Sequence, residues 1–154
     1  CGSPLLFLRR PRFHWALPLV GRRQRQVGIR VSEKTVRVWG AVTGDDELTM
    51  QGHTNCVNSV GFSPGGLKMV SASHDKTVRV WSALTGDCEQ TMAGHTSAVN
   101  SAAFNPEGQK IVSASADKTV RVWSAVTGEC EQTLRGHSDV VRSAEFSPDG
   151  LKIV

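Results

Sequence analysis

The chain has 154 residues, of which 39% are hydrophobic and 21% charged, with 15 glycines and four cysteines. This composition excludes a collagen, a disordered tail and a disulfide-dense mini-protein. Apolar runs fall far short of the roughly 20 residues that a membrane-spanning helix needs, and no C-x-x-C pair offers a zinc framework. The net charge of +4 divides into +7 on residues 1–30 and −3 on residues 31–154, so the charge does not indicate a nucleic-acid-binding domain.

Residues 1–26 form an arginine-rich segment in which apolar residues recur without a period. Arg9, Arg10 and Arg12 interrupt the continuous apolar stretch that a secretory signal requires. We expect this segment to be poorly ordered. Three interpretations remain open: a flexible basic arm, sequence outside any natural domain, or a contact for nucleic acid or an anionic membrane.

From about residue 27 onward, the sequence repeats every 42 residues. The hexapeptide K-T-V-R-V-W occupies residues 34–39, 76–81 and 118–123. Gly-His pairs keep the same step at 52–53, 94–95 and 136–137. A register that holds across several residue types predicts a repeat architecture.

Each period is predicted to contain four short strands. In the second period we expect them over residues 57–62, 67–73, 77–82 and 88–92. Pro64 and Gly66 mark the first turn, because proline presets its φ and glycine adopts a positive φ. No segment has the periodicity of a long amphipathic helix, so an all-β fold is expected.

The four-strand period, the Gly-His pair and the tryptophan closing each third strand resemble the WD-repeat β-propeller family over residues 27–154. The resemblance implies an incomplete propeller arc of four-stranded antiparallel blades. The expected parts are a partial blade over 27–51, blades over 57–93 and 99–135, and a partial blade over 141–154. The family's Trp-Asp dipeptide is replaced by Trp-Gly at 39–40 and by Trp-Ser at 81–82 and 123–124. Because propellers close with about 4–8 blades, this arc is expected to be a piece of a longer propeller or to associate to complete one.

The resemblance further implies a buried hydrogen-bonded set in each complete blade. The two sets are His53, Ser71, Asp75 and Trp81, and His95, Ser113, Asp117 and Trp123. The chemistry suits this role, because an aspartate at a turn accepts backbone N–H groups, a histidine links carboxylate to hydroxyl, and a buried indole N–H needs an acceptor. Ser71 and Ser73 lie on the same face of their strand, so the sequence leaves open which one supplies the hydroxyl.

Serine, histidine and aspartate together also invite a hydrolytic reading, which the sequence disfavours. A catalytic site is needed once, whereas this set recurs at a fixed step. Gly61 and Gly66 have phosphate-loop spacing, but Leu67 stands where lysine is required. The histidines at 53, 95 and 137 lie on different blades, which argues against a shared metal. We therefore expect no catalytic residue, no cofactor and no metal.

The cysteines are assigned from their place in the repeat. Cys88 and Cys130 occupy equivalent outer-strand positions and are interpreted as small apolar filler. Cys56 follows a Gly-His loop, where an exposed thiol is the alternative. No N-x-[ST] acceptor site exists, so nothing favours the secretory route.

The expected function is a non-catalytic scaffold for protein–protein interaction. Loop residues vary between blades while the framework repeats, so one rim of the propeller is the candidate partner-binding site. Its residues are Asn55, Cys56, His74, Ser97, Ala98, Ala116 and Asp139. The plainer reading is that these are tolerant surface loops. The alternative function is a regulatory or sensor region of a larger multidomain protein whose catalytic domain lies elsewhere. The expected partners are other proteins, with nucleic acid considered only for residues 1–26 and with no membrane span.

Overall fold

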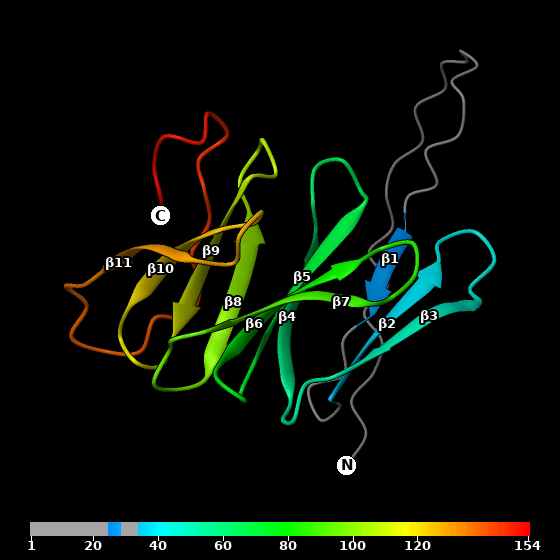
Figure 1. The fold of residues 1–154 in the computed structure, drawn as a ribbon, viewed down its shortest axis with the longest axis horizontal. Helices are drawn as coiled ribbons and strands as arrows, with labels where there is room; N and C mark the ends of the chain where they lie inside the picture. Colours follow the sequence, from blue (N-terminus) through cyan, green and yellow to red (C-terminus); the bar gives the residue numbers. More distant parts are fainter. Residues whose placement is uncertain (1–24, 29–33) are drawn as a thin grey trace, which may run out of the picture.

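The computed structural model describes residues 34–154 in full and the backbone of residues 25–28 (Figure 1). Within these ranges the chain is all-β, as the repeat predicts. The first sheet has strands β1 (Arg25–Gly28), β2 (Thr35–Gly40) and β3 (Asp46–Gln51). The second has β4 (Val57–Phe62), β5 (Lys68–Ser73), β6 (Thr77–Ser82) and β7 (Cys88–Ala93). The third has β8 (Val99–Phe104), β9 (Lys110–Ser115), β10 (Val120–Ser124) and β11 (Cys130–Leu134).

Each sheet is an antiparallel meander in which neighbours in sequence are neighbours in space. The hydrogen-bonded orders are β1-β2-β3, β4-β5-β6-β7 and β8-β9-β10-β11. Figure 1 shows the sheets following one another as an open fan that does not close on itself. In the parts of the chain that the structure describes, no helix is long and apolar enough to cross a membrane.

The ends of the repeat array differ in detail from the expected boundaries. Strand β1 begins at Arg25, two residues before the expected start of the first partial blade. Residues 141–154, expected as a partial blade, form only an isolated bridge between Phe146 and Ile153. Beside this bridge, Glu145 and Val154 exchange two backbone hydrogen bonds of 3.0 Å, and the Val141 N–H donates to the Ser115 carbonyl oxygen at 3.1 Å.

The turns between first and second strands follow the predicted chemistry. Gly66 has a φ of +70°, and its N–H donates to the Ser63 carbonyl oxygen at 2.8 Å. Gly108 in the next blade has a φ of +72° and bonds Asn105 at 2.9 Å. Glycine recurs at these two turns because residues with a Cβ atom are strained at a positive φ.

The hydrophobic core lies between the sheets. Successive strand residues point to opposite faces, and in β5 both faces are buried. Met69 belongs to a cluster shared with Val36 and Met50 of the first sheet. Val70 belongs to a cluster shared with Ile111 of the third sheet. Five of the six β5 residues are buried, and its two serines, Ser71 and Ser73, are buried with their hydroxyls hydrogen-bonded.

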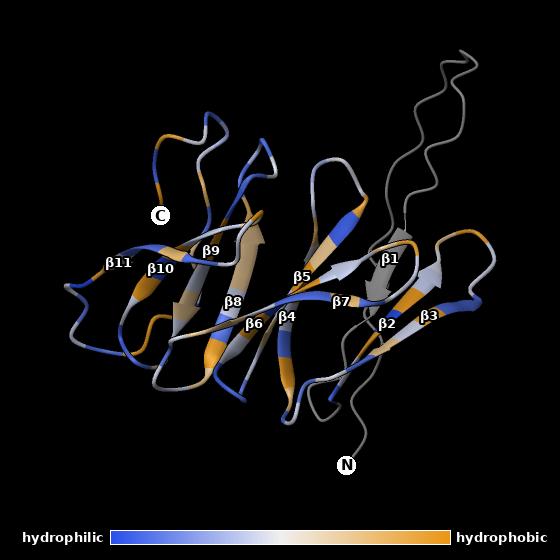
Figure 2. Ribbon diagram, in the orientation of Figure 1, coloured by the Kyte–Doolittle hydropathy of each residue, from blue (hydrophilic) through white to orange (hydrophobic). Residues whose placement is uncertain are grey.

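The outer strands face solvent more than the inner ones. Apolar residues mark β4, β5 and β8 in Figure 2, whereas β7 and β11 carry mostly hydrophilic residues. In β7 only Met92 is buried, and it packs into the cluster between the second and third sheets.

Side-chain amides join the first strands of neighbouring blades. The Asn58 Nδ2 on β4 donates to the Val99 carbonyl oxygen on β8 at 2.8 Å. Asn100, one repeat later, donates to the Val141 carbonyl oxygen at 2.8 Å. These asparagines were not predicted to have a role, although their recurrence at a step of 42 residues was a usable signal.

Candidate binding rim and its buried hydrogen-bond network

Four side chains from separate strands and loops meet inside the second sheet. The His53 Nε2 lies 2.7 Å from the Ser71 Oγ, and the His53 Nδ1 lies 2.7 Å from the Asp75 Oδ2. The indole Nε1–H of Trp81 donates to the Ser71 Oγ at 2.8 Å. Trp81 is also packed edge-on against the histidine ring, with centroids 5.9 Å apart. Of the two serines left open by the sequence, it is Ser71 that contacts His53 and Trp81.

The directions of the donors fix one consistent arrangement of protons. Since an indole nitrogen can only donate, the Ser71 Oγ accepts from Trp81 and can donate its own proton to the His53 Nε2. The Nδ1–H of His53 then donates to the Asp75 carboxylate. This order requires a neutral histidine protonated on Nδ1 and an ionised aspartate.

The electrostatics favour these two protonation states. Burial is the largest influence on His53 and lowers its pKa, although the hydrogen bond and the charge of Asp75 act in the opposite direction. Burial alone would raise the pKa of Asp75. Hydrogen bonds from Thr77, His53 and the Thr54 backbone outweigh it, so the pKa of Asp75 is lowered. The network therefore holds a neutral imidazole beside a carboxylate.

The third sheet repeats this arrangement one period later. His95 lies 2.8 Å from the Ser113 Oγ and 2.7 Å from the Asp117 Oδ2. The Trp123 Nε1–H donates to the Ser113 Oγ at 2.8 Å. Burial lowers the pKa of His95, although the hydrogen bond to Asp117 acts in the opposite direction. The pKa of Asp117 is lowered because hydrogen bonds from Thr119, His95 and the Thr96 backbone outweigh its burial.

A threonine that was not among the predicted network residues completes each network. The Thr77 Oγ1–H donates to the Asp75 Oδ1 at 2.6 Å, and the Thr77 backbone N–H donates to the same oxygen at 2.9 Å. Thr119 makes the same two bonds to Asp117 at 2.6 and 3.0 Å. The signal was present, because both segments read D-K-T.

Ser73 has a separate task beside the network. Its Oγ donates to the carbonyl oxygens of Asn55 and Cys56, at 3.1 and 2.8 Å, and accepts the Asp75 N–H at 3.1 Å. Ser115 ties Ala98 and Asp117 in the same way. These serines fix the rim loops on the network below them.

The serine–histidine–aspartate geometry resembles a hydrolytic triad, but its surroundings differ from those of one. Ser71 and Ser113 are 0% exposed, so neither hydroxyl can reach a substrate. Each hydroxyl is also occupied by an indole donor. A nucleophile needs an open face beside an oxyanion site, whereas these oxygens are enclosed by core side chains.

The candidate rim residues lie on loops that are tied together in pairs. The His74 N–H donates to the Cys56 carbonyl oxygen at 2.9 Å, and the Ala116 N–H donates to the Ala98 carbonyl oxygen at 2.9 Å. The exposed members of the rim are Asn55, His74 and Asp139. The half-buried members are Cys56, Ser97, Ala98 and Ala116.

One contact links the rim of adjacent blades. The Lys118 Nζ donates to the Ser138 carbonyl oxygen at 2.9 Å, which brings the loop beside Ala116 to the loop that carries Asp139. Rim loops of neighbouring blades are therefore parts of one continuous edge.

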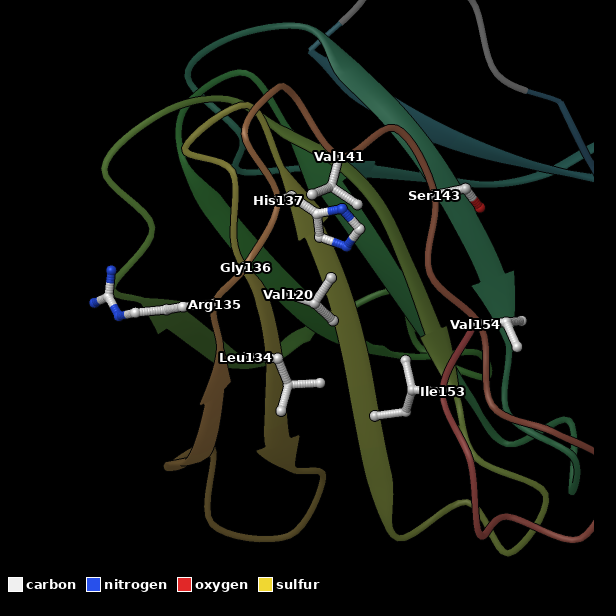
Figure 3. Close-up of a pocket in the computed structure, with 9 residues that line it drawn as sticks. All are labelled: Val120, Leu134, Arg135, Gly136, His137, Val141, Ser143, Ile153 and Val154. Atoms are coloured by element: carbon white, nitrogen blue, oxygen red, sulfur yellow. The ribbon is translucent and has the colours of Figure 1, made fainter.

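The third Gly-His pair lies beside a hollow at the far end of the arc. This hollow of about 390 Å³ is lined mainly by apolar side chains, among them Val120, Leu134 and Ile153. Figure 3 shows His137 beside Val141 and Val120, with the Arg135 side chain directed away from the hollow. In contrast to His53 and His95, which are buried, His137 is exposed.

The prediction that Cys88 and Cys130 are apolar filler is wrong. Both side chains are exposed, because β7 and β11 are edge strands with solvent beside them. Cys56 is half-buried rather than fully exposed. Among the described residues, no group of three or more His, Cys, Asp or Glu side chains is placed to hold a metal ion.

Four-stranded antiparallel sheets that pack face to face along a fan define an open arc of propeller blades. Comparison with known families agrees: the model of the WD domain, G-beta repeat, matches residues 44–82, 86–124 and 128–154, more than half of the chain. The chain therefore belongs to the WD40-repeat family, whose repeats generally mediate protein–protein interaction.

A curated relative gives the same assignment. The chain is 35% identical over 69 residues to Lissencephaly-1 homolog 1 of Paramecium tetraurelia. The match covers 40% of this chain and 17% of that protein, so the chain spans only a small part of this relative.

Proposed function

We propose that this chain is a non-catalytic scaffold that binds partner proteins through the rim formed by Asn55, Cys56, His74, Ser97, Ala98, Ala116 and Asp139. The proposal rests on one observation: the buried hydrogen-bond network is the same in both complete blades, whereas the side chains of the rim differ between them. Histidine-to-aspartate distances are 2.7 Å in both complete blades, and tryptophan-to-serine distances are 2.8 Å in both.

The side chains displayed on this frame differ in chemistry from blade to blade. The second sheet presents an amide and an imidazole, from Asn55 and His74, where the third presents Ser97 and Ala116. The next loop presents the carboxylate of Asp139. A rigid edge with varied polar and apolar groups suits protein recognition, because a preorganised surface loses little conformational entropy on binding.

The proposal that the scaffold is non-catalytic rests on the burial of Ser71 and His53. The serine, histidine and aspartate that could carry hydrolysis sit beneath the rim with their polar atoms paired. Their arrangement supports a role in holding the loops that bind.

The test compares partner binding by variants of the full-length protein with matched charge changes. His74→Glu and Asp139→Lys alter the rim, whereas Gln109→Glu and Asp87→Lys make the same changes on exposed turns away from it. Affinity for a partner isolated with the wild-type protein is measured by calorimetry, after circular dichroism has verified folding. Loss of at least tenfold confined to the rim variants supports the proposal. Equal affinity in all four variants, or loss confined to the turn variants, would refute it.

A further inference from the structure

A second recurring constellation lies on the outer strands, away from the rim. In the second sheet the Arg79 Nη1 lies 3.8 Å from the Cys88 Sγ, and the Thr91 Oγ1 lies 3.6 Å from the same sulfur. In the third sheet Arg121 and Thr133 lie 4.0 and 3.7 Å from the Cys130 Sγ. Both thiols are exposed.

The first sheet shows what kind of group this position accepts. Asp46 occupies the repeat position of Cys88 and Cys130, 42 and 84 residues earlier. The Arg37 Nη1 lies 3.7 Å from its Oδ2, and the Thr49 Oγ1 donates to that oxygen at 3.4 Å. The same pair of donors thus holds an anion in one blade and a sulfur atom in the other two.

The arginines beside the cysteines have charge available for an anion. Each guanidinium lies over a tryptophan ring, with Arg79 5.9 Å from the Trp81 centroid and Arg121 5.8 Å from that of Trp123. Their Nε atoms are buried and have no hydrogen-bond partner within the described part of the chain. Neither arginine forms an ion pair with a described carboxylate, in contrast to Arg37.

Acidic neighbours oppose this attraction only in part. Asp87 and Glu89 flank Cys88, but the Glu89 carboxylate is bound by the Lys68 ammonium at 2.9 Å. Glu131 beside Cys130 is bound by Lys110 at 2.8 Å. In the resting thiol, the Cys88 Sγ–H donates to the Gln90 carbonyl oxygen at 3.4 Å, which leaves the sulfur lone pairs to the arginine and the threonine.

We propose that Cys88 and Cys130 are sites of reversible thiolation by a small disulfide that carries carboxylates, of the glutathione class. The thiol proton leaves to solvent, and the thiolate attacks one sulfur of the disulfide. The disulfide's S–S bond breaks as the new Sγ–S bond forms, and the departing thiolate takes up a proton. The cysteine sulfur is oxidised and the departing sulfur is reduced, so no further oxidant is needed. The guanidinium beside each sulfur attracts the carboxylates of the incoming disulfide and so brings its S–S bond to the cysteine.

The experiment exposes the folded full-length protein to glutathione disulfide and follows each cysteine by peptide mass spectrometry. Cys56 is the reference thiol, because it is half-buried and has no arginine donor among the described residues. Cys88 and Cys130 are expected to form mixed disulfides about two- to fivefold faster than Cys56, the factor that attraction between exposed opposite charges gives. With cystamine, a cationic disulfide, Cys88 and Cys130 are expected to react no faster than Cys56.

Two variants separate the arginine's effect from simple exposure. Arg79→Gln is expected to slow Cys88 by about two- to fivefold while Cys130 in the same molecule keeps its rate. Arg121→Gln is expected to do the reverse. Since each variant carries an unaltered blade as its control, a global folding defect would be seen as slowing or acceleration at both sites. Equal rates at Cys88 and Cys56, or a Cys88-to-Cys130 ratio unchanged by Arg79→Gln, would overturn the proposal.

Discussion

The Asn58 Nδ2 donates to the Val99 carbonyl oxygen at 2.8 Å and so links two blades whose backbones share no strand pairing. Asn100 and Val141 repeat the bond one period later. Apolar packing between sheets is non-directional, whereas this bond fixes which backbone group of one blade lies against its neighbour. The relative position of the rim loops depends on such bonds.

Replacing Asn58 by alanine is expected to destabilise the protein by about 1–2 kcal/mol, because the Val99 carbonyl loses its side-chain donor. Urea unfolding of the full-length protein measures the effect. Gln109→Ala, at an exposed turn, serves as the control and should change the free energy of unfolding by no more than about 0.5 kcal/mol. Equal effects of the two substitutions would show that the inter-blade bond contributes nothing.

Acid is expected to weaken the fold in two stages. The pKa values of His53 and His95 are lowered from 6.5 in the folded protein, so the unfolded chain takes up these protons first as the pH falls below about 6.5. Stability is then lost by at most about 1.4 kcal/mol per pH unit for each histidine. The pKa values of Asp75 and Asp117 are lowered from 3.8, so a second loss begins below about pH 3.8.

Urea midpoints measured between pH 8 and pH 5 test the first stage. His53→Asn should reduce the change in the free energy of unfolding between pH 7 and pH 5, because it removes one of the two histidines whose pKa is lowered. A free energy of unfolding that stays constant or rises between pH 7 and pH 5 would contradict the assignment of neutral, buried histidines.

Lys76 is expected to be a site where glycine stabilises the protein. Its φ is +72°, and Lys118 repeats this at +68°. Left-handed backbone costs an L-residue about 1–2 kcal/mol, and glycine's extra freedom in the unfolded chain offsets about 0.5–1 kcal/mol of the relief. Lys76→Gly should therefore raise the free energy of unfolding by about 0.5 kcal/mol. Lys76→Ala is the control, since it keeps the strain, and a stability gain from alanine equal to that from glycine would exclude strain relief as the cause.

Much of the fold follows from the period of the sequence. Strands β4 and β6 have the bounds that alternation and turn residues predict, 57–62 and 77–82. The family resemblance predicted the contact between His53 and a strand serine, but only the structure distinguishes Ser71 from Ser73. Both serines are buried on one strand, and only the position of the indole and imidazole distinguishes them.

Other features depend on partners that residue type does not reveal. The acceptor of Asn58 is a backbone carbonyl 41 positions away, and any residue could supply it. Cys88 is exposed because it lies on β7, the edge strand of its sheet, where most side chains face solvent. Residues 1–24 and 29–33, including most of the arginine-rich segment, lie outside the described part of the chain.

We expect the four side chains of the network in the second sheet, Trp81, Ser71, His53 and Asp75, to stabilise the blade as one unit beneath the rim. A double-mutant cycle with Ser71→Ala and Trp81→Phe tests it most directly, because the two side chains share one hydrogen bond of 2.8 Å. Unfolding free energies of the wild-type protein, both single variants and the double variant give the coupling. We expect each single variant to be destabilised by about 2–4 kcal/mol and the coupling energy to be about 1–2 kcal/mol. Effects that add to within about 0.3 kcal/mol would contradict the account.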